Sequence, residues 1–337
     1  RFRGERSDGI YMPLESLSWT YAEATLQEGD QFTELGGYQI CTKYLTPATK
    51  RAMAGQGKGL SHREIKQFPK HDVTKQYRYF ADQIPTDAVI YLSEKIHGTQ
   101  GRYAHVLDTA PLPVWKRFLN TYVFHSGVFK PSSKYVHLNG SKNVILEKAD
   151  SRNSWYGTDE FRYAATAGLT LHKGEALYFE IVGWADGNIP IMPSHDVTKT
   201  GLKDIREQYG DQIQYTYGCP EGQSRIYVYK ITMANEDGIV TDLSWPQVVA
   251  RCGELGLAHV PMLAGPMTLQ ELVAVCGWGY GQDGEHVPFM ESALEALTQT
   301  VEQFTDGPST LNSKQIREGV VVRVESKLGT SYFKNKS

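Results

Sequence analysis

The sequence SEKIHGT at residues 93–99 decides how the surrounding chain is interpreted. An apolar run at residues 88–92 precedes it, and a second strand-like run at residues 102–106 follows. This order predicts a hairpin with Lys95 at its mouth, where two glycines let the backbone pass close to a neighbour. A lysine at a strand end beside a glycine loop suits covalent chemistry on a phosphate. By itself, however, the pattern is more typical of a solvated lysine in a tight turn.

Five further segments change that balance because they follow in a fixed order. They are residues 151–152 (SR), 179–183 (FEIVG), 226–229 (IYVY), 318–321 (EGVV) and 333–337 (FKNKS). Together with residues 94–98 (EKIHG), they resemble motifs I, Ia, III, IIIa, IV and V of the covalent polynucleotide ligases. The Lys-x-His-Gly form, where many relatives have Lys-x-Asp-Gly, resembles the nick-sealing branch of the RNA ligases. The resemblance covers residues 86–337.

The resemblance implies an α+β fold with antiparallel sheets. It places a nucleotidyltransferase (adenylation) domain at residues 86–337, after a linker at residues 61–85. Residues 1–60 contain turns and short alternating segments that suit a small β-barrel, and in this context they resemble an OB-like module. The strands alone also fit another small β-domain, or an extension packed on the catalytic domain. Because the sequence begins at Arg1 and stops inside a motif, we expect residues to be missing at either end.

The composition is that of a globular protein, with 337 residues, 40% hydrophobic and 22% charged. This length allows two domains and a sizeable core. The net charge of −3 means that any nucleic-acid site must be a local basic patch. No apolar run approaches the roughly 18 residues of a membrane span, and no secretory leader pattern is present. Four scattered cysteines predict reduced thiols in a cytoplasmic protein and no structural zinc. We expect a monomer without a membrane partner.

Helical spacing of apolar residues predicts helices at residues 269–276 and 288–304, both packed on the sheet. A shorter helical pattern, residues 202–209, lies within a polar segment between Gly183 and Gln223. We expect this insertion beside the motifs to form a substrate-contacting surface.

Several basic residues precede the first motif, namely Lys58, Arg63, Lys66, Lys70 and Lys75. They either anchor phosphates or belong to a solvated linker. The stretch HDVTK at residues 71–75 recurs at residues 195–199 without a period, which indicates coincidence. At His71, a turn with an N-cap aspartate is favoured over a metal site.

The resemblance also implies roles for individual residues. Lys95 attacks the α-phosphate of ATP and becomes lysyl-AMP. Nucleotide contacts are implied for Glu94, Ile96, Gln100, Arg152, Glu180, Tyr229, Lys334 and Lys336. Within that set, Glu180 holds the ribose, and Tyr229 stacks on adenine with Tyr227 as the alternate on the same strand face. Glu318 organises Mg²⁺ or Mn²⁺ through oxygen or bound water, as a hard cation requires.

Two positions depart from the family pattern. Gln100 stands where asparagine is common, and Tyr229 is followed by lysine where the family commonly has phenylalanine followed by aspartate. The alignment of the segment around Tyr229 is therefore the weakest of the six.

The chemistry requires a neutral lysine amine, which is rare at pH 7 because a free lysine titrates near 10.4. Nearby cations favour the neutral form, and Lys334, Lys336, Arg152 and a bound metal ion are expected to supply them. Lys334 and Lys336 are two apart on a predicted strand and share a face, which suits gripping a triphosphate.

His97 is expected to orient the loop that includes Gly98, or to meet the polynucleotide. Imidazole is a poor ligand for a hard cation, so the metal is assigned to Glu318 instead. A general-base role for His97 is the less favoured alternative.

The implied activity is ATP-dependent RNA ligation. AMP passes from Lys95 to a 5′-phosphate end, and a 3′-hydroxyl then displaces AMP, at nicks in duplexes with RNA on the 3′-hydroxyl side. A DNA ligase or an mRNA capping guanylyltransferase shares the lysine chemistry, but both usually carry an OB domain after the last motif, where this sequence ends. The non-enzyme alternative is a β-rich nucleic-acid-binding protein that forms no covalent AMP.

Overall fold

The computed structural model describes most of the chain from residue 64 onward and part of the N-terminal segment. The described residues are 12–21, 25–27, 30, 32–41, 64–71, 73–110, 112–124, 128–146, 156, 159–186, 189–198, 203–276 and 289–336. Arg152, Lys58 and Arg63 lie outside them, as does Asp72 of the predicted turn. In the described part, no helix has the length and apolar character needed to cross a bilayer.

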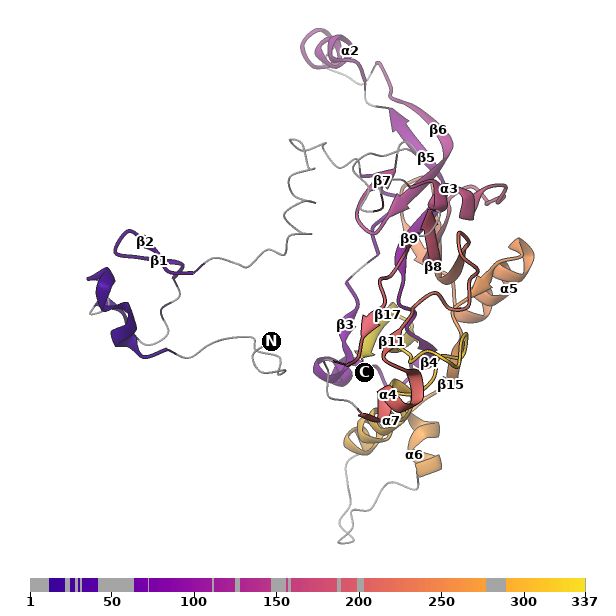
Figure 1. The fold of residues 1–337 in the computed structure, drawn as a ribbon. Helices are drawn as coiled ribbons and strands as arrows, with labels where there is room; N and C mark the ends of the chain where they lie inside the picture. Colours follow the sequence, from indigo (N-terminus) through magenta and orange to yellow (C-terminus); the bar gives the residue numbers. More distant parts are fainter. Residues whose placement is uncertain are drawn as a thin grey trace.

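Two sheets built mainly from antiparallel pairs form the body of the molecule (Figure 1). The larger sheet has the order β13-β12-β8-β5-β6-β7, with β14 beside β12 and β9 beside β8. Its strands are β5 (Thr99–Ala110), β6 (Ser132–Ser141), β7 (Ile145–Leu146), β8 (Glu175–Asp186), β9 (Ile189–Pro190), β12 (Ser224–Ala234), β13 (Val240–Asp242) and β14 (Ala258–His259). The smaller sheet has the order β15-β4-β16-β17-β3. Its strands are β3 (Lys75–Gln76), β4 (Val89–Glu94), β15 (Met262–Met267), β16 (Gly319–Ser326) and β17 (Gly329–Lys336). The predicted α+β fold with antiparallel sheets is confirmed.

The smaller sheet has one face against helices and the other against a cavity. Along β16, Val320, Val322 and Val324 are buried in a cluster with residues of α7 (Phe289–Thr305), while Val321 and Arg323 line the cavity. This division follows from the alternation of side chains along a strand. The predicted helix at residues 269–276 is α6 (Leu269–Cys276), and the second predicted helix is α7.

The predicted hairpin around Lys95 is wrong. β4 pairs with β15 and β16 in the smaller sheet, whereas β5 pairs with β6 and β8 in the larger one. Since both edges of each strand are occupied by other partners, the four residues 95–98 cross from one sheet to the other. Lys95 therefore lies at the junction of the two sheets rather than at a turn within one.

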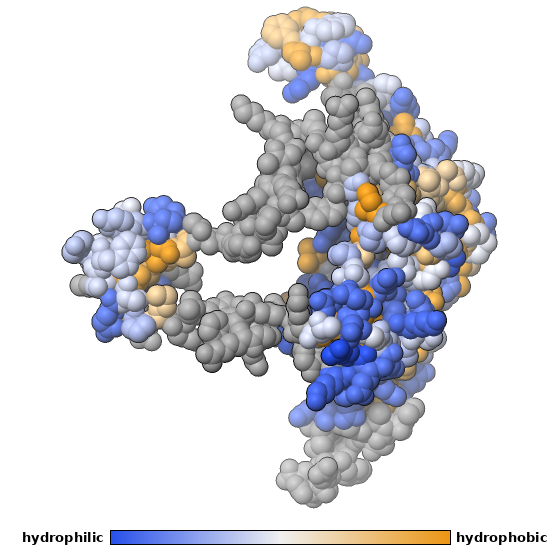
Figure 2. Space-filling view, in the orientation of Figure 1, coloured by the Kyte–Doolittle hydropathy of each residue, from blue (hydrophilic) through white to orange (hydrophobic). Residues whose placement is uncertain are grey.

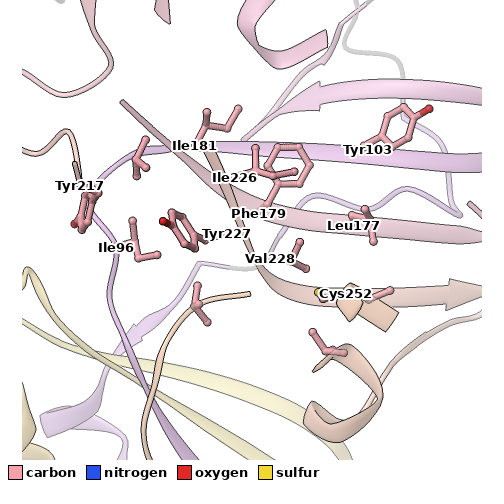
Figure 3. Close-up of a cluster of buried hydrophobic side chains, with 14 of the residues drawn as sticks. Ile96, Tyr103, Leu177, Phe179, Ile181, Tyr217, Ile226, Tyr227, Val228 and Cys252 are labelled. Atoms are coloured by element: carbon pink, nitrogen blue, oxygen red, sulfur yellow. The ribbon is translucent and has the colours of Figure 1, made fainter. Parts of the chain in front are cut away.

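The core of the larger sheet explains why glycines flank this crossing. Phe179 and Ile181 of β8 are buried in a cluster with Ile96 and Tyr227 (Figure 3). A Cβ at Gly98 would lie 2.3 Å from the carbonyl oxygen of Ile181, and one at Gly101 would lie 2.3 Å from the Phe179 ring. The close approach predicted for these glycines is therefore present, and its partner is β8.

Two helices beside the larger sheet were not predicted, α3 (Glu160–Thr166) and α5 (Trp245–Leu255). The sequence does carry a signal for α5. Ser244 and Gln247 form a capping box, proline follows in the first turn, and Gly256 ends the helix in the left-handed conformation.

Residues 64–71 and 73–84, which the sequence analysis placed within a linker at residues 61–85, contact both sheets. Phe68 is buried against the larger sheet, and Tyr77 and Ile84 are buried with α7 and the smaller sheet. Arg102 of β5, only 2% exposed, donates to the carbonyl oxygens of Phe68 and Pro69 at 3.3 and 2.9 Å. This part of the chain therefore packs on the two sheets. The division into domains at residue 86 stays a prediction.

The described N-terminal residues contain a 3₁₀ helix, Leu14–Thr20, and a short hairpin of β1 (Glu34–Leu35) and β2 (Tyr38–Gln39). The ring centroids of Trp19 and Tyr38 lie 5.2 Å apart. The OB-like module at residues 1–60 stays a prediction, because most of that segment lies outside the described residues.

The predicted insertion contains β10 (His195–Asp196), β11 (Gln212–Ile213) and the helix α4 (Lys203–Tyr209). The short helix expected at residues 202–209 is confirmed. The tyrosines that follow β11 contact the crossing segment at residues 95–98, as described below.

Candidate active site

A cavity of about 280 Å³ lies between the two sheets, and most of the predicted site residues line it. Its lining includes Ser93, Glu94, Lys95, Ile96, Gln100, Lys142, Glu180, Tyr229, Val321, Arg323, Tyr332, Lys334 and Lys336. Segments separated by more than 200 residues in sequence thereby meet at one place. Arg152 alone among the predicted nucleotide contacts lies outside the described residues.

Lys95 is fixed by its backbone and by a carboxylate partner. Its backbone N–H donates to the carbonyl oxygen of Gly319 at 3.0 Å. Its Nζ lies 2.5 Å from Oε2 of Glu318, and the lysine side chain is 21% exposed. The sequence analysis anticipated only positive neighbours here. To attack a phosphate, the amine of Lys95 must therefore break its contact with Glu318 and approach the phosphorus atom.

Glu318 is the centre of the charged cluster. Its Oε2 also lies 3.2 Å from Nδ1 of His97, and its Oε1 accepts from Nζ of Lys336 at 2.8 Å. Burial opposes ionisation, but the hydrogen bond from His97 and the charge of Lys95 outweigh it and lower the pKa of Glu318 to about 2. Because its pKa is so low, the Glu318 carboxylate is ionised at neutral pH and can bind cations.

Lys334 and Lys336 share a face of β17, as predicted, and both line the cavity. Partial burial, together with the charges of Lys336 and Lys95, lowers the pKa of Lys334. Lys142, just after β6, lines the same cavity and adds to this effect. The sequence analysis missed Lys142 because it belongs to none of the motifs. These cations make a pocket that favours a polyanion.

Glu180 of β8 lines the same cavity and lies beside Gly98. Burial raises the pKa of Glu180 to about 8, opposed mainly by the charge of Lys95 and reinforced by Glu318. The backbone N–H of Gly98 donates to its carboxyl group. At neutral pH the Glu180 carboxyl group is therefore mostly protonated and able to donate a hydrogen bond.

Tyr229 reaches the cavity through a β-bulge. The pairing of β12 with β8 shifts between Val228 and Lys230, which leaves Tyr229 as the extra residue. Tyr229 lines the cavity, whereas Tyr227 is 4% exposed in the core cluster with Ile96 (Figure 3). The bulge breaks the two-residue alternation that the prediction of one shared face assumed.

Three residues contact Tyr229 or its neighbour Tyr332 or belong to this pair, namely His71, Arg323 and Tyr332. The sequence analysis assigned none of them to the nucleotide site. Arg323 donates to the carbonyl oxygen of Tyr229 at 3.3 Å and to the hydroxyl of Tyr332 at 3.0 Å. The ring of His71 lies 5.1 Å from that of Tyr229 and 5.3 Å from that of Tyr332, centroid to centroid. No single motif carries them, so only the folded chain identifies them.

Glu94 and Gln100 are held by neighbours outside the motifs. Oε2 of Glu94 accepts from the backbone and hydroxyl of Thr310, at 2.9 and 2.6 Å. Its Oε1 is buried without a hydrogen-bond partner among the described residues. Arg162 of α3 donates to the carbonyl oxygen of Gln100 at 2.7 Å and to Oγ1 of Thr99 at 2.9 Å. These bonds fix the two ends of the crossing segment.

His97 is anchored by the insertion. Its backbone N–H donates to the hydroxyl of Tyr217 at 2.7 Å, and its ring packs edge to face on Tyr215 with centroids 4.5 Å apart. Tyr217 is 2% exposed and has a φ of 52°. The substrate contact expected of the insertion stays a prediction. In the structure, two of its tyrosines support the segment that includes Lys95.

The residues around Lys95 fit a hard divalent cation that also binds substrate phosphates. Among the described residues, no three His, Cys, Asp or Glu side chains gather into a ready-made metal centre. Glu318 does not itself line the cavity, but it offers an ionised carboxylate in contact with Lys95, which does. Mg²⁺ and Mn²⁺ sites in phosphoryl-transfer enzymes commonly combine one or two carboxylates with substrate oxygens.

Comparisons with known proteins agree with this assembly of motifs. A family model described as RNA ligase matches residues 88–336, and no curated protein sequence matches the chain. One similar solved structure is an apo mutant of a Naegleria gruberi RNA ligase, at 14% identity and a TM-score of 0.43. The alignment covers 82% of the present chain and 58% of the length of the Naegleria chain.

Two further mutants of a Naegleria gruberi RNA ligase are also similar. One, with ATP and Mn, is 18% identical with a TM-score of 0.45, and the other, with AMP and Mn, is 14% identical with a TM-score of 0.43. Each covers 100% of this chain and is covered over 73% of its own length. With TM-scores below 0.5, these likenesses carry no argument about function.

Proposed function

The chain belongs to the RNA ligase family, whose model matches residues 88–336, and from this premise we propose that it is an ATP-dependent RNA ligase that is adenylylated on Lys95. The observation that carries the proposal is the position of Lys95 in the cavity, between Glu318 and the cations of β17. A nucleophile, a carboxylate that holds cations and a basic wall are the parts that phosphoryl transfer needs.

In the first step, Nζ of Lys95 attacks the α-phosphorus of ATP. The N–P bond forms, the bond between the α-phosphorus and the bridging oxygen breaks, pyrophosphate leaves, and the proton of the amine passes to solvent. Lys334 and Lys336 neutralise the phosphate oxygens. Glu318 is the residue to hold Mg²⁺ or Mn²⁺, which would add positive charge at the triphosphate. Holding that cation would take the Glu318 carboxylate away from Lys95, whose amine would then be free to face the phosphate.

The walls of the cavity support adenosine as the nucleoside. Tyr229 and Val321 line it from the two sheets and offer an aromatic and an aliphatic surface to a base. Glu94 also lines the cavity, and its carboxylate is an acceptor that the amino group of adenine can satisfy. The protonated Glu180 donates to a ribose hydroxyl.

In the later steps, AMP passes from Lys95 to the 5′-phosphate of a nucleic acid, and a 3′-hydroxyl displaces AMP and closes the strand. We propose that the substrate is a nick in a duplex with RNA on the 3′-hydroxyl side. A DNA ligase remains the second candidate. Sealing assays in which the terminal nucleotides are exchanged between ribose and deoxyribose separate the two.

The test of the first step is the mass of the purified protein after incubation with ATP and Mn²⁺. The proposal expects a gain of one adenylate, located on Lys95 by peptide mapping, with ATP and not with GTP. Lys95→Ala should abolish the gain, whereas Lys327→Ala, at an exposed turn, should leave it intact. Absence of any adduct, or an adduct at another residue, rejects the assignment.

A further inference from the structure

A long arm projects from the larger sheet. β5 and β6 pair from Gly101 and Ser141 to Ala110 and Ser132, and the chain between them forms α2 (Val114–Phe118) and a π-helical turn (Leu119–Val123). Figure 1 shows α2 at the far end of these strands, away from β4 and β17. At about 3.3 Å per residue, the arm places this end roughly 35 Å from Thr99 beside the active site. We call residues 112–124 and 128–130 the arm tip.

The arm tip exposes apolar side chains that no other part of the described chain covers. Val114 is 81% exposed, Trp115 58%, Phe118 57% and Tyr122 66%. In Figure 2 the tip shows apolar side chains mixed with hydrophilic ones. A group of exposed aromatic side chains of this kind usually marks a binding surface.

The same stretch of sequence is basic, although the chain as a whole is acidic. The arm tip contains three cationic side chains, Lys116, Arg117 and Lys130, and no aspartate or glutamate, against a net charge of −3 for the protein. The partner of this surface is therefore expected to be an anion.

The arm tip has a defined shape rather than that of an open loop. The side-chain amide of Asn120 donates to the carbonyl oxygen of Phe129 at 2.8 Å and accepts from its N–H at 3.0 Å. The rings of Trp115 and Phe129 lie 5.9 Å apart, and Nζ of Lys116 lies 5.2 Å from the Trp115 ring centroid. Aromatic faces and ammonium groups are thus fixed next to one another before any partner binds.

We propose that the arm tip binds unpaired nucleotides of the RNA substrate, about 35 Å from the bond that is sealed. Bases stack on Trp115, Phe118 and Tyr122, and phosphates pair with Lys116, Arg117 and Lys130. A fully paired duplex offers phosphates but keeps its bases stacked internally, so it leaves the aromatic side chains without a partner. Single-stranded nucleotides carry a phosphate and a planar base in every unit, which matches the alternation of cationic and aromatic side chains at the arm tip. The inference rests on the proposed ligase function and specifies the form of its substrate.

The test compares two nicked RNA duplexes that differ only in a single-stranded tail of about 10 nucleotides, attached roughly 10 base pairs from the nick. Tails are placed on either side of the nick in separate substrates. Binding is measured by fluorescence anisotropy with protein already adenylylated on Lys95, and sealing is measured in the same samples. The arm variant is W115A/K116A. The matched control is K327A/L328A, a lysine and an apolar residue at the exposed turn between β16 and β17, where Leu328 is 96% exposed.

The proposal expects one tailed substrate to bind the wild-type protein and the control about tenfold more tightly than the tail-less duplex. The arm variant should lose that advantage and keep the tail-less affinity and the rate of Lys95 adenylylation. Equal binding of tailed and tail-less substrates by the wild-type protein overturns it. So does an arm variant that loses affinity for both substrates alike, which would indicate a duplex contact, or that changes only the protein's self-association.

A failure of the ligase function itself is recognised separately, because it removes the adenylate from the wild-type protein before any RNA is added. In that case the anisotropy of non-adenylylated protein still reports whether the tail binds the arm tip.

Discussion

The hydroxyl oxygen of Tyr217 accepts a hydrogen bond from the backbone N–H of His97, two residues beyond Lys95. The donor belongs to the segment that crosses between the sheets, and the acceptor to the insertion after β11. This bond ties the segment that includes Lys95 to a part of the chain that lies 120 residues away in sequence. The position of Lys95, the proposed nucleophile, therefore depends on the insertion.

Tyr217→Phe should show this dependence directly. Removing the hydroxyl leaves the His97 N–H without its partner, which costs about 1–3 kcal/mol of unfolding free energy. Adenylylation of Lys95 should slow by about an order of magnitude because the segment loses a fixed point. Tyr215→Phe is the matched control, since its ring contact with His97 does not use the hydroxyl. Equal rates for the two variants would show that the bond does not position Lys95.

His97→Ala should leave adenylylation by ATP partly intact, whereas Lys95→Ala should abolish it. The backbone bond to Tyr217 survives the substitution, and the carboxylate of Glu318 keeps its two lysine partners. The measurement is the rate of mass gain with ATP and Mn²⁺. If His97→Ala is as inactive as Lys95→Ala, the orienting role assigned to His97 is wrong.

Glu318→Gln should reduce the rate of adenylylation by about 100-fold or more, because the amide keeps the shape but loses the charge that holds a divalent cation. Binding of Mn²⁺ in the presence of ATP, followed by electron paramagnetic resonance, should weaken in parallel. Glu302→Gln, an exposed change on α7, serves as the control. Undiminished Mn²⁺ binding by Glu318→Gln would remove this residue from the metal site.

The free energy of unfolding should decrease as the pH rises, because Glu180 is buried and must then ionise in the folded protein. Its folded-state pKa of about 8 lies above the reference value of 4.5, so the folded chain holds the proton more tightly than the unfolded chain does. The stabilising contribution is complete below pH 4.5 and is lost as the pH rises toward 8. Glu180→Gln, which cannot ionise, should give a flatter curve of unfolding free energy against pH over this window. Glu236→Gln, in the turn between β12 and β13, should follow the wild-type curve.

Arg102→Met should destabilise the fold by about 2–4 kcal/mol, measured by urea unfolding. The guanidinium group is buried and donates to the carbonyl oxygens of Phe68, Pro69 and Ser141, which would all lose their donor. Arg206→Met removes an exposed ion pair with Asp211 and should change stability by less than about 1 kcal/mol. Similar losses in both variants would mean that Arg102 does not pin residues 68–69 to the sheet.

The sequence alone determined the order of the motifs, the helices α4, α6 and α7, and eight of the residues that line the cavity, namely Glu94, Lys95, Ile96, Gln100, Glu180, Tyr229, Lys334 and Lys336. Periodicity sufficed for α6 and α7 because each buries apolar residues against the smaller sheet. Periodicity also placed Lys334 and Lys336 on one face of a strand. It failed at Tyr229, because a β-bulge adds a residue and ends the alternation from which the prediction started.

Only the tertiary structure decided that β4 and β5 belong to different sheets, that Glu318 is the partner of Lys95, and that Tyr217, Arg323 and Lys142 support the site. The partner of a strand depends on which other strands of the folded chain offer a free edge. The local sequence of a strand does not identify those distant partners. The charges around Lys95 come from segments more than 200 residues apart, so their mutual effect exists only when the two sheets meet.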